Sequence, residues 1–65
     1  GLGLGRELVR RGIAFNRERW PGHAIRIGAQ ARLTAFYESL GFSVDGDSYD
    51  EDGIAHIHMT LPAAD

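Results

Sequence analysis

Apolar residues recur at helical spacing in two stretches of the chain and at alternate positions in two others. From Arg6 onward, Val9 and Ile13 stand four positions apart within a periodic apolar run, which predicts an amphipathic helix. Pro21 and Gly22 end this helix, because proline disfavours helical geometry in the residue before it and glycine permits a turn. We therefore expect the first third of the chain to be mainly helical.

The segment that follows alternates in the manner of a strand. Over residues 23–29, Ile25 and Ile27 share one face and Arg26 lies on the other. The later segments that we expect are a short strand at 42–44, a loop or hairpin tip in the acidic stretch 45–53 and an alternating strand at 54–61.

A wide apolar stripe between these strands predicts a second helix. Gly41 suits the left-handed position that follows a last helical turn, and Phe42 is placed to fold back on that turn. The elements then run loop, helix, strand, helix, strand, strand, without an internal repeat or linker, which predicts a single α/β unit. The stripe consists of Ala29, Leu33, Phe36, Tyr37 and Leu40.

The composition is that of a globular protein, with 65 residues, 7 Lys+Arg against 9 Asp+Glu and 43% hydrophobic residues. The absence of cysteine excludes a disulfide, a thiolate zinc site and a cysteine nucleophile in these residues. The chain has no basic excess for general nucleic-acid binding, no apolar run of about 20 residues for a membrane span and no signal-peptide pattern. We therefore expect a cytoplasmic protein that binds neither nucleic acid nor membrane.

The core that such a chain builds is small. A domain of this size rarely retains more than about 3 to 5 kcal/mol of net stability without a staple. The chain also opens on Gly-Leu-Gly-Leu-Gly with no initiator methionine. We therefore expect residues 1–65 to be part of one larger domain whose remaining portion lies upstream.

The charged residues are sorted along the chain. All seven arginines lie within residues 1–32, whereas residues 33–65 hold no lysine or arginine and seven acidic residues. Two interpretations are open at this point. Either the two halves pair with each other across the fold, or one end takes an anionic ligand and the other a cationic one.

Glycines at alternate positions open the chain, and Gly1, Gly3 and Gly5 predict a loop because each costs about 1 kcal/mol relative to alanine in a helix. A glycine-rich loop that leads into a helix suits phosphate, since unobstructed backbone N–H groups and the helix dipole converge on an anion. Arg6 would add a positive charge. Ordinary tight turns show the same pattern, however, and neither a P-loop nor a dinucleotide fingerprint is present.

Tyr37 and two histidines are further candidates. A tyrosine on a helix beside the anion site would donate its hydroxyl proton to a developing thiolate or alkoxide, but periodicity alone favours Tyr37 as a stripe residue with a surface hydroxyl. His56 and His58 share one face of the expected strand, yet no third ligand is evident, so we predict no metal site. Tyr49 and Asp50 break the pattern of a calcium loop in the acidic stretch.

Two motifs, in this order, resemble the second half of a GNAT-superfamily N-acetyltransferase. Gly3 and Gly5 match the small positions of the family loop Q/R-x-x-G-x-G/A, whose leading residue would precede Gly1. Residues 36–42, Phe-Tyr-Glu-Ser-Leu-Gly-Phe, form the more specific match. Further segments that resemble the ElaA-type subgroup are 21–23, 28–30 and 49–54.

The resemblance implies the GNAT fold, a mixed sheet that splays open between its fourth and fifth strands around acetyl-coenzyme A. Residues 1–65 would form the C-terminal, acetyl-coenzyme A-binding half of that domain. Gln30 would lie near the pantetheine arm, and Tyr37 would protonate the departing thiolate; Leu33 departs from an alanine common in the family. The residues implied to hold the pyrophosphate are Gly1, Leu2, Gly3, Leu4, Gly5 and Arg6.

The implied reaction is the direct attack of an amine on the thioester in a ternary complex. The general base and the oxyanion donor are expected upstream of residue 1. Asp50, Glu51 and Asp52 are expected near the acceptor entrance, where they would favour a cationic amine. The partners implied are acetyl-coenzyme A, an amine acceptor, the missing N-terminal half of the domain and, as in many members, a second copy of the chain.

The alternative is a non-catalytic acyl-coenzyme A-binding or protein-interaction module of the same fold. Cofactor binding without acetyl transfer would favour it. An interaction module made of residues 1–65 alone is disfavoured, because the strand at 23–29 would expose a bare edge.

Overall fold

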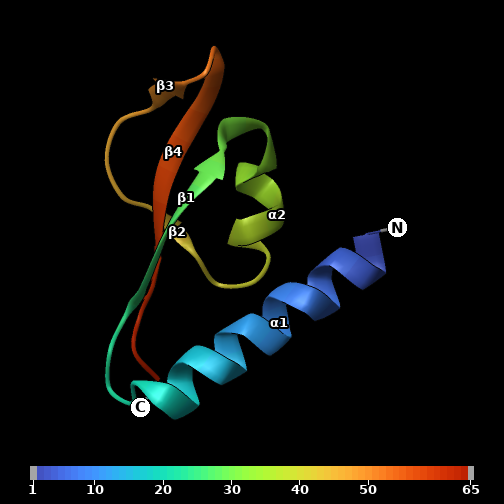
Figure 1. Ribbon diagram of the computed structural model, residues 1–65, viewed down its shortest axis with the longest axis vertical. Coiled ribbons are helices and arrows are strands. Elements are labelled where there is room, and N and C mark those ends of the chain that lie inside the picture. Colours follow the sequence, from blue (N-terminus) through green and yellow to red (C-terminus); the bar gives the residue numbers. More distant parts are fainter. Residues whose placement is uncertain (1, 65) are drawn as a thin grey trace.

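The computed structural model describes residues 2–64, which fold as an α/β unit with both helices on the same side of a small sheet (Figure 1). The expected α/β class is therefore confirmed. The elements run in the order α1 (Leu2–Arg19), β1 (Ile25–Gln30), a 3-10 turn η1 (Ala31–Leu33), α2 (Thr34–Glu38), β2 (Ser43–Val44), β3 (Tyr49–Glu51) and β4 (Ile54–Leu61).

Helix α1 begins at Leu2, so the prediction of a glycine loop over residues 1–5 is wrong for its described part. Gly3 and Gly5 lie in the first turns of an 18-residue helix, and neither has a positive φ. Each glycine costs about 1 kcal/mol there, and the continuous hydrogen-bonding of a long helix outweighs that cost. The predicted end of the helix is confirmed: its last residue is Arg19, and Gly22 turns the chain with φ 80°.

Strand β4 is the centre of the sheet. It pairs with β1 along one edge and with β2 and β3 along the other, and each of these pairings is antiparallel. The register sets Ile27 opposite Met59 and Gly28 opposite His58. The outer edge of β1 has no partner strand among the residues described, and this is the edge where the resemblance implies a neighbouring strand.

The core lies between the sheet and the two helices. Met59 is fully buried at its centre, and Ile13 of α1 packs against the same cluster. The other apolar side chains of α1 lie largely outside it, because Leu4, Leu8 and Phe15 are 67%, 61% and 59% exposed. The remaining buried residues of the core are Ala29, Phe42 and Leu61.

The second helix is shorter than predicted. Ala29 and Gln30 belong to β1, where they pair with β4, and Ala29 is buried in the core. The 3-10 turn η1 separates them from α2, and the hydroxyl of Thr34 donates a hydrogen bond to the carbonyl of Ala31 at 2.7 Å. Sheet pairing and burial therefore override the helical periodicity of the first stripe residues.

The acidic segment ends in a β-hairpin. Strands β3 and β4 are joined by Asp52 and Gly53, whose φ angles are 52° and 77°. A two-residue turn with positive φ at both positions matches the twist of the flanking strands, and Asp-Gly is a preferred pair for it. A hairpin tip was one of the predicted alternatives for this segment, whereas strand Tyr49–Glu51 was not predicted.

One ion pair joins the basic and acidic halves of the chain within residues 2–64. The Nε of Arg26 donates to Oδ2 of Asp45 at 3.1 Å, and the hydroxyl of Thr60 donates to the same oxygen at 2.7 Å. The Thr60 hydrogen bond and then the Arg26 guanidinium hold the pKa of Asp45 below its ordinary value. This exposed cluster fastens β1, β4 and the segment after β2 to one another.

Candidate functional site

The end of α2 fixes the position of Tyr37. The Phe42 N–H donates to the Tyr37 carbonyl at 3.1 Å, and the Gly41 N–H donates to the Glu38 carbonyl at 3.0 Å. With Gly41 at φ 99°, these two bonds form a Schellman motif, as the sequence predicted. The buried ring of Phe42 then meets the Tyr37 ring edge-on, with the centroids 5.7 Å apart.

Tyr37 lines a cavity between α1, α2 and β1, with a volume of about 320 Å³. Gly12 and Ile13 of α1 line one side of the cavity, and Ile27 and Gly28 of β1 line another. Its walls are largely apolar, and the phenol of Tyr37 is the titratable group among the side chains that line it. A flexible, mainly apolar chain fits such a space, with a proton donor at its wall.

One side chain from the start of α1, that of Arg6, reaches the helix that carries Tyr37. The Arg6 guanidinium is 5.8 Å from the centroid of the Phe36 ring, and Phe36 meets Tyr37 edge-on at 5.1 Å. The first N–H groups of a helix have no intrahelical acceptor, and a Cβ at Gly3 or Gly5 would meet no atom within 4 Å. In the described part of the motif the unpaired donors are the N–H groups of Leu2, Gly3 and Leu4, although these residues are helical; Gly1 lies outside the described residues.

Gln30 is not brought to this cavity. It ends β1 opposite His56, and its side-chain oxygen accepts a hydrogen bond from Nε of Arg32 at 2.9 Å. His23 lies in the exposed connection between α1 and β1. The acidic residues expected at an acceptor entrance, Asp50, Glu51 and Asp52, are exposed at the hairpin of β3 and β4.

The other face of the sheet holds aromatic residues that sequence reasoning did not bring together. The ring of Tyr49 stacks on His58 and His56 with centroids 4.7 and 5.6 Å apart. Spacing indicated that His56 and His58 share a face, but Tyr49 reaches them only because β3 pairs with β4. Within residues 2–64 no group of three or more His, Cys, Asp or Glu side chains is arranged to hold a metal ion.

Comparison with known proteins identifies the family. Residues 1–63 match the family model described as "Acetyltransferase (GNAT) domain". The chain belongs to the GNAT acetyltransferase family. It is 44% identical over 59 residues to UPF0039 protein sll0451 of Synechocystis and 39% identical over 59 residues to ElaA of Escherichia coli, covering 91% of this chain in both cases.

Solved GNAT structures show the same arrangement of elements. An acyl-CoA N-acyltransferase from Pseudomonas aeruginosa matches with a TM-score of 0.86 and 36% identity, over 91% of this chain and 40% of that one. The structure of Escherichia coli ElaA matches with a TM-score of 0.81 and 36% identity, over 89% of this chain and 38% of that one. The resemblance to the GNAT superfamily and its ElaA-type members is thus confirmed.

The chain is shorter than the GNAT proteins it matches. It covers 38% of the Synechocystis protein and 39% of ElaA. In the part of the chain that the structure describes, no helix combines the length and the apolar character that crossing a membrane requires.

Proposed function

We propose that these residues form the acyl-donor half of an amine N-acetyltransferase that uses acetyl-coenzyme A. The contact between Arg6 and Phe36 carries this proposal. It brings a side chain from the start of α1, where the helix has unpaired N–H donors, to α2, which also carries Tyr37. One extended acetyl-coenzyme A molecule would then place its diphosphate at the start of α1 and its thioester sulfur near Tyr37.

The roles follow from the chemistry of these groups. The N–H groups of the opening turn and the Arg6 side chain hold the pyrophosphate, because the positive end of a helix dipole attracts anions. The residues concerned are Gly1, Leu2, Gly3, Leu4, Gly5 and Arg6. Gln30 is proposed to contact the pantetheine arm, although it lies outside the Tyr37 cavity in this structure.

Tyr37 is the general acid of the proposed reaction. An amine attacks the thioester carbonyl directly, and the phenol of Tyr37 donates its proton to the sulfur as the carbon–sulfur bond breaks. Tyr37 lines the cavity, and packing against Phe36 and Phe42 restrains its ring on two sides. Positioning of the reacting groups supplies much of the rate in a ternary complex.

Binding and transfer are tested separately. The segment is produced within a chain of the length that its relatives have, and acetyl-coenzyme A is added in a calorimetric titration. We expect saturable binding, followed by release of free thiol when polyamines, amino acids or peptide amines are supplied. Binding without thiol release from any of these amines would favour a non-catalytic acyl-coenzyme A-binding module over an enzyme. Absence of binding would contradict both hypotheses.

A further inference from the structure

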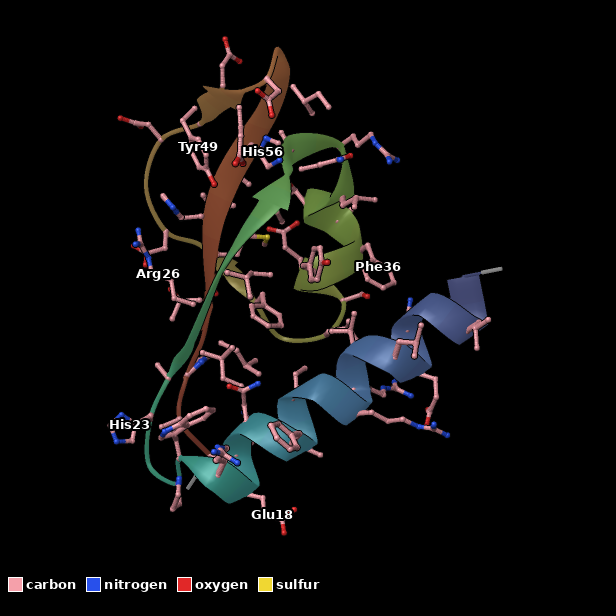
Figure 2. The ribbon with its side chains drawn as sticks, viewed as in Figure 1. Glu18, His23, Arg26, Phe36, Tyr49 and His56 are labelled. Carbon is pink, nitrogen blue, oxygen red and sulfur yellow. The ribbon has the colours of Figure 1, made fainter. Side chains whose placement is uncertain are left out.

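Three rings are stacked on the sheet face that the helices leave uncovered. Tyr49 comes from β3, and His56 and His58 come from β4 at alternate positions. The planes of both imidazoles lie 28° from the plane of the phenol ring. Figure 2 shows Tyr49 and His56 side by side at the upper end of the sheet, away from Phe36 on α2.

The hydroxyl of Tyr49 reaches the backbone of β1. A Cβ placed on Gly28 would lie 2.5 Å from the Tyr49 oxygen and 4.0 Å from Cδ2 of His58. Tyr49 therefore extends across β4 to the strand whose outer edge is free, and only glycine leaves room for its hydroxyl there. Gly28 also lines the cavity of Tyr37, so this residue of β1 adjoins both that cavity and the Tyr49 hydroxyl.

The two histidines differ in their partners. Nδ1 of His56 is 2.8 Å from the Ile54 carbonyl, and its Nε2 is 3.6 Å from a carboxylate oxygen of Glu51. The ring nitrogens of His58 make no hydrogen bond to residues 2–64, and the side chain is half-buried beneath Tyr49. A fixed imidazole without a protein partner is available to a ligand.

We propose that Tyr49 and His58 form the acceptor-amine subsite of the acetyltransferase, an inference that rests on the proposed function. The acceptor class is a primary alkylammonium ion. Its N–H groups donate to the Tyr49 oxygen and to a ring nitrogen of His58, while the carboxylate of Glu51 on the same face of β3 favours its positive charge.

His58 and Tyr37 each take part in the proton transfers of the proposed reaction. Neutral His58 takes one proton from the ammonium ion and later passes it to water. The freed lone pair attacks the thioester carbonyl carbon, so the carbon–nitrogen bond forms and the carbon–sulfur bond breaks. The thiolate takes the proton of Tyr37, and the phenolate of Tyr37 recovers the second proton that the nitrogen loses. The products are the amide, the free thiol and one proton released to water.

The decisive variant is His58→Ala, tested in a chain of the relatives' length. We expect kcat/KM for the amine to fall by about 100-fold, since general base catalysis contributes at least that factor. Acetyl-coenzyme A affinity, measured by calorimetry, should stay at the wild-type value. Added imidazole should restore part of the lost turnover, which no purely structural role of His58 would permit. His56→Gln is the matched control on the same strand and face, with kcat/KM expected to remain near wild type.

Gly28→Ala provides a second test that removes neither the Tyr49 nor the His58 side chain. The new methyl group displaces the Tyr49 hydroxyl, so the KM for the amine should rise several-fold. If the wild type acetylates amines and both His58→Ala and Gly28→Ala retain its kinetics, the proposed subsite is wrong, while the proposed acetyltransferase function is supported. If the wild type binds no acetyl-coenzyme A, the proposed function fails, and the subsite fails with it.

Discussion

The Tyr37 carbonyl accepts the N–H of Phe42 at 3.1 Å while the rings of the same two residues meet edge-on at 5.7 Å. Backbone and side chain of Phe42 thus fix the same tyrosine. The Phe-Tyr-x-x-x-Gly-Phe pattern therefore has a physical meaning: the glycine permits the reversal, and the second aromatic residue returns to the last turn.

Gly41→Ala should destabilise the fold. A non-glycine residue in the left-handed region costs about 1 to 2 kcal/mol, and the new Cβ would lie 3.0 Å from Cδ1 of Leu61. Urea denaturation measures the loss in the free energy of unfolding. Gly46→Ala is the control, because Gly46 also has a positive φ but a Cβ there meets nothing within 4 Å. Equal losses in the two variants would show that contact with Leu61 is unimportant.

Tyr37→Phe removes the proposed proton donor and keeps the ring that packs against Phe36 and Phe42. We expect kcat to fall by about 100-fold while the dissociation constant of acetyl-coenzyme A stays constant, because the hydroxyl acts only as the sulfur departs. Steady-state kinetics and calorimetry measure the two quantities. Unchanged turnover in this variant would leave Tyr37 as a packing residue alone.

Gly3→Ala should raise the stability of the fold while it lowers the affinity for acetyl-coenzyme A. Alanine raises helix propensity by up to about 1 kcal/mol, and the space around Gly3 accommodates the methyl group. The same methyl group would stand where backbone donors meet the pyrophosphate, so acetyl-coenzyme A affinity should fall. Thermal unfolding and calorimetry report the two effects. Glu18→Ala, at the exposed far end of α1, is the control that should leave affinity unchanged; a Gly3→Ala variant of full affinity would refute the pyrophosphate site.

Asp45 should make stability depend on pH in the acid range. Its pKa is lowered in the folded state, so the stabilisation is fully present above the unfolded value of 3.8 and is lost as the pH falls through the folded value. The difference in unfolding free energy between wild type and Asp45→Ala should therefore shrink as the pH is lowered from 5 through about 4 and below. A difference that is constant over this range would mean that the Thr60 and Arg26 contacts do not depend on the charge.

Removing the negative charges of the β3–β4 hairpin tests whether its acidic residues lie near the acceptor entrance. A triple variant with Asp50→Asn, Glu51→Gln and Asp52→Asn should raise the KM for a cationic amine, most clearly at low salt, where electrostatic attraction is least screened. Asparagine tolerates the positive φ of Asp52, so the turn is preserved. Asp47→Asn in the adjacent loop is the control. An unchanged KM would reduce the three residues to a role in solubility.

Local rules made much of this fold predictable. The breaker residues after Arg19, the alternation of Ile25 and Ile27, and the Gly41-Phe42 reversal each depend on a few neighbouring residues, and each prediction is confirmed. The local cost of glycine predicts a loop at the start of the chain, whereas the hydrogen bonding of the whole 18-residue helix α1 outweighs that cost. Ala29 falls in both the predicted strand and the predicted helical stripe; it belongs to the strand, because it pairs with β4, a partner that no local pattern contains.

The candidate site also contains some residues that the sequence predicted and others that it did not. The motif located Tyr37 on its helix, and its catalytic role stays a prediction. The stack of Tyr49 on His56 and His58 was beyond sequence reasoning, because it requires both the β3–β4 register and a strand residue without a side chain at Gly28. The alternation of Tyr49 and Glu51 was a weak signal for β3, obscured by the acidic residues around it.

The pairing of β1 with β4 also governs how the chain folds. Ile25 lies opposite Leu61, so this ladder forms only after most of the chain between them has been drawn together. The β3–β4 hairpin, closed by its Asp-Gly turn, needs only neighbouring residues and can form within about 1 to 10 μs. We therefore expect a β4 template to be present before β1 docks, which makes the closure of that last, long loop the slow step of folding.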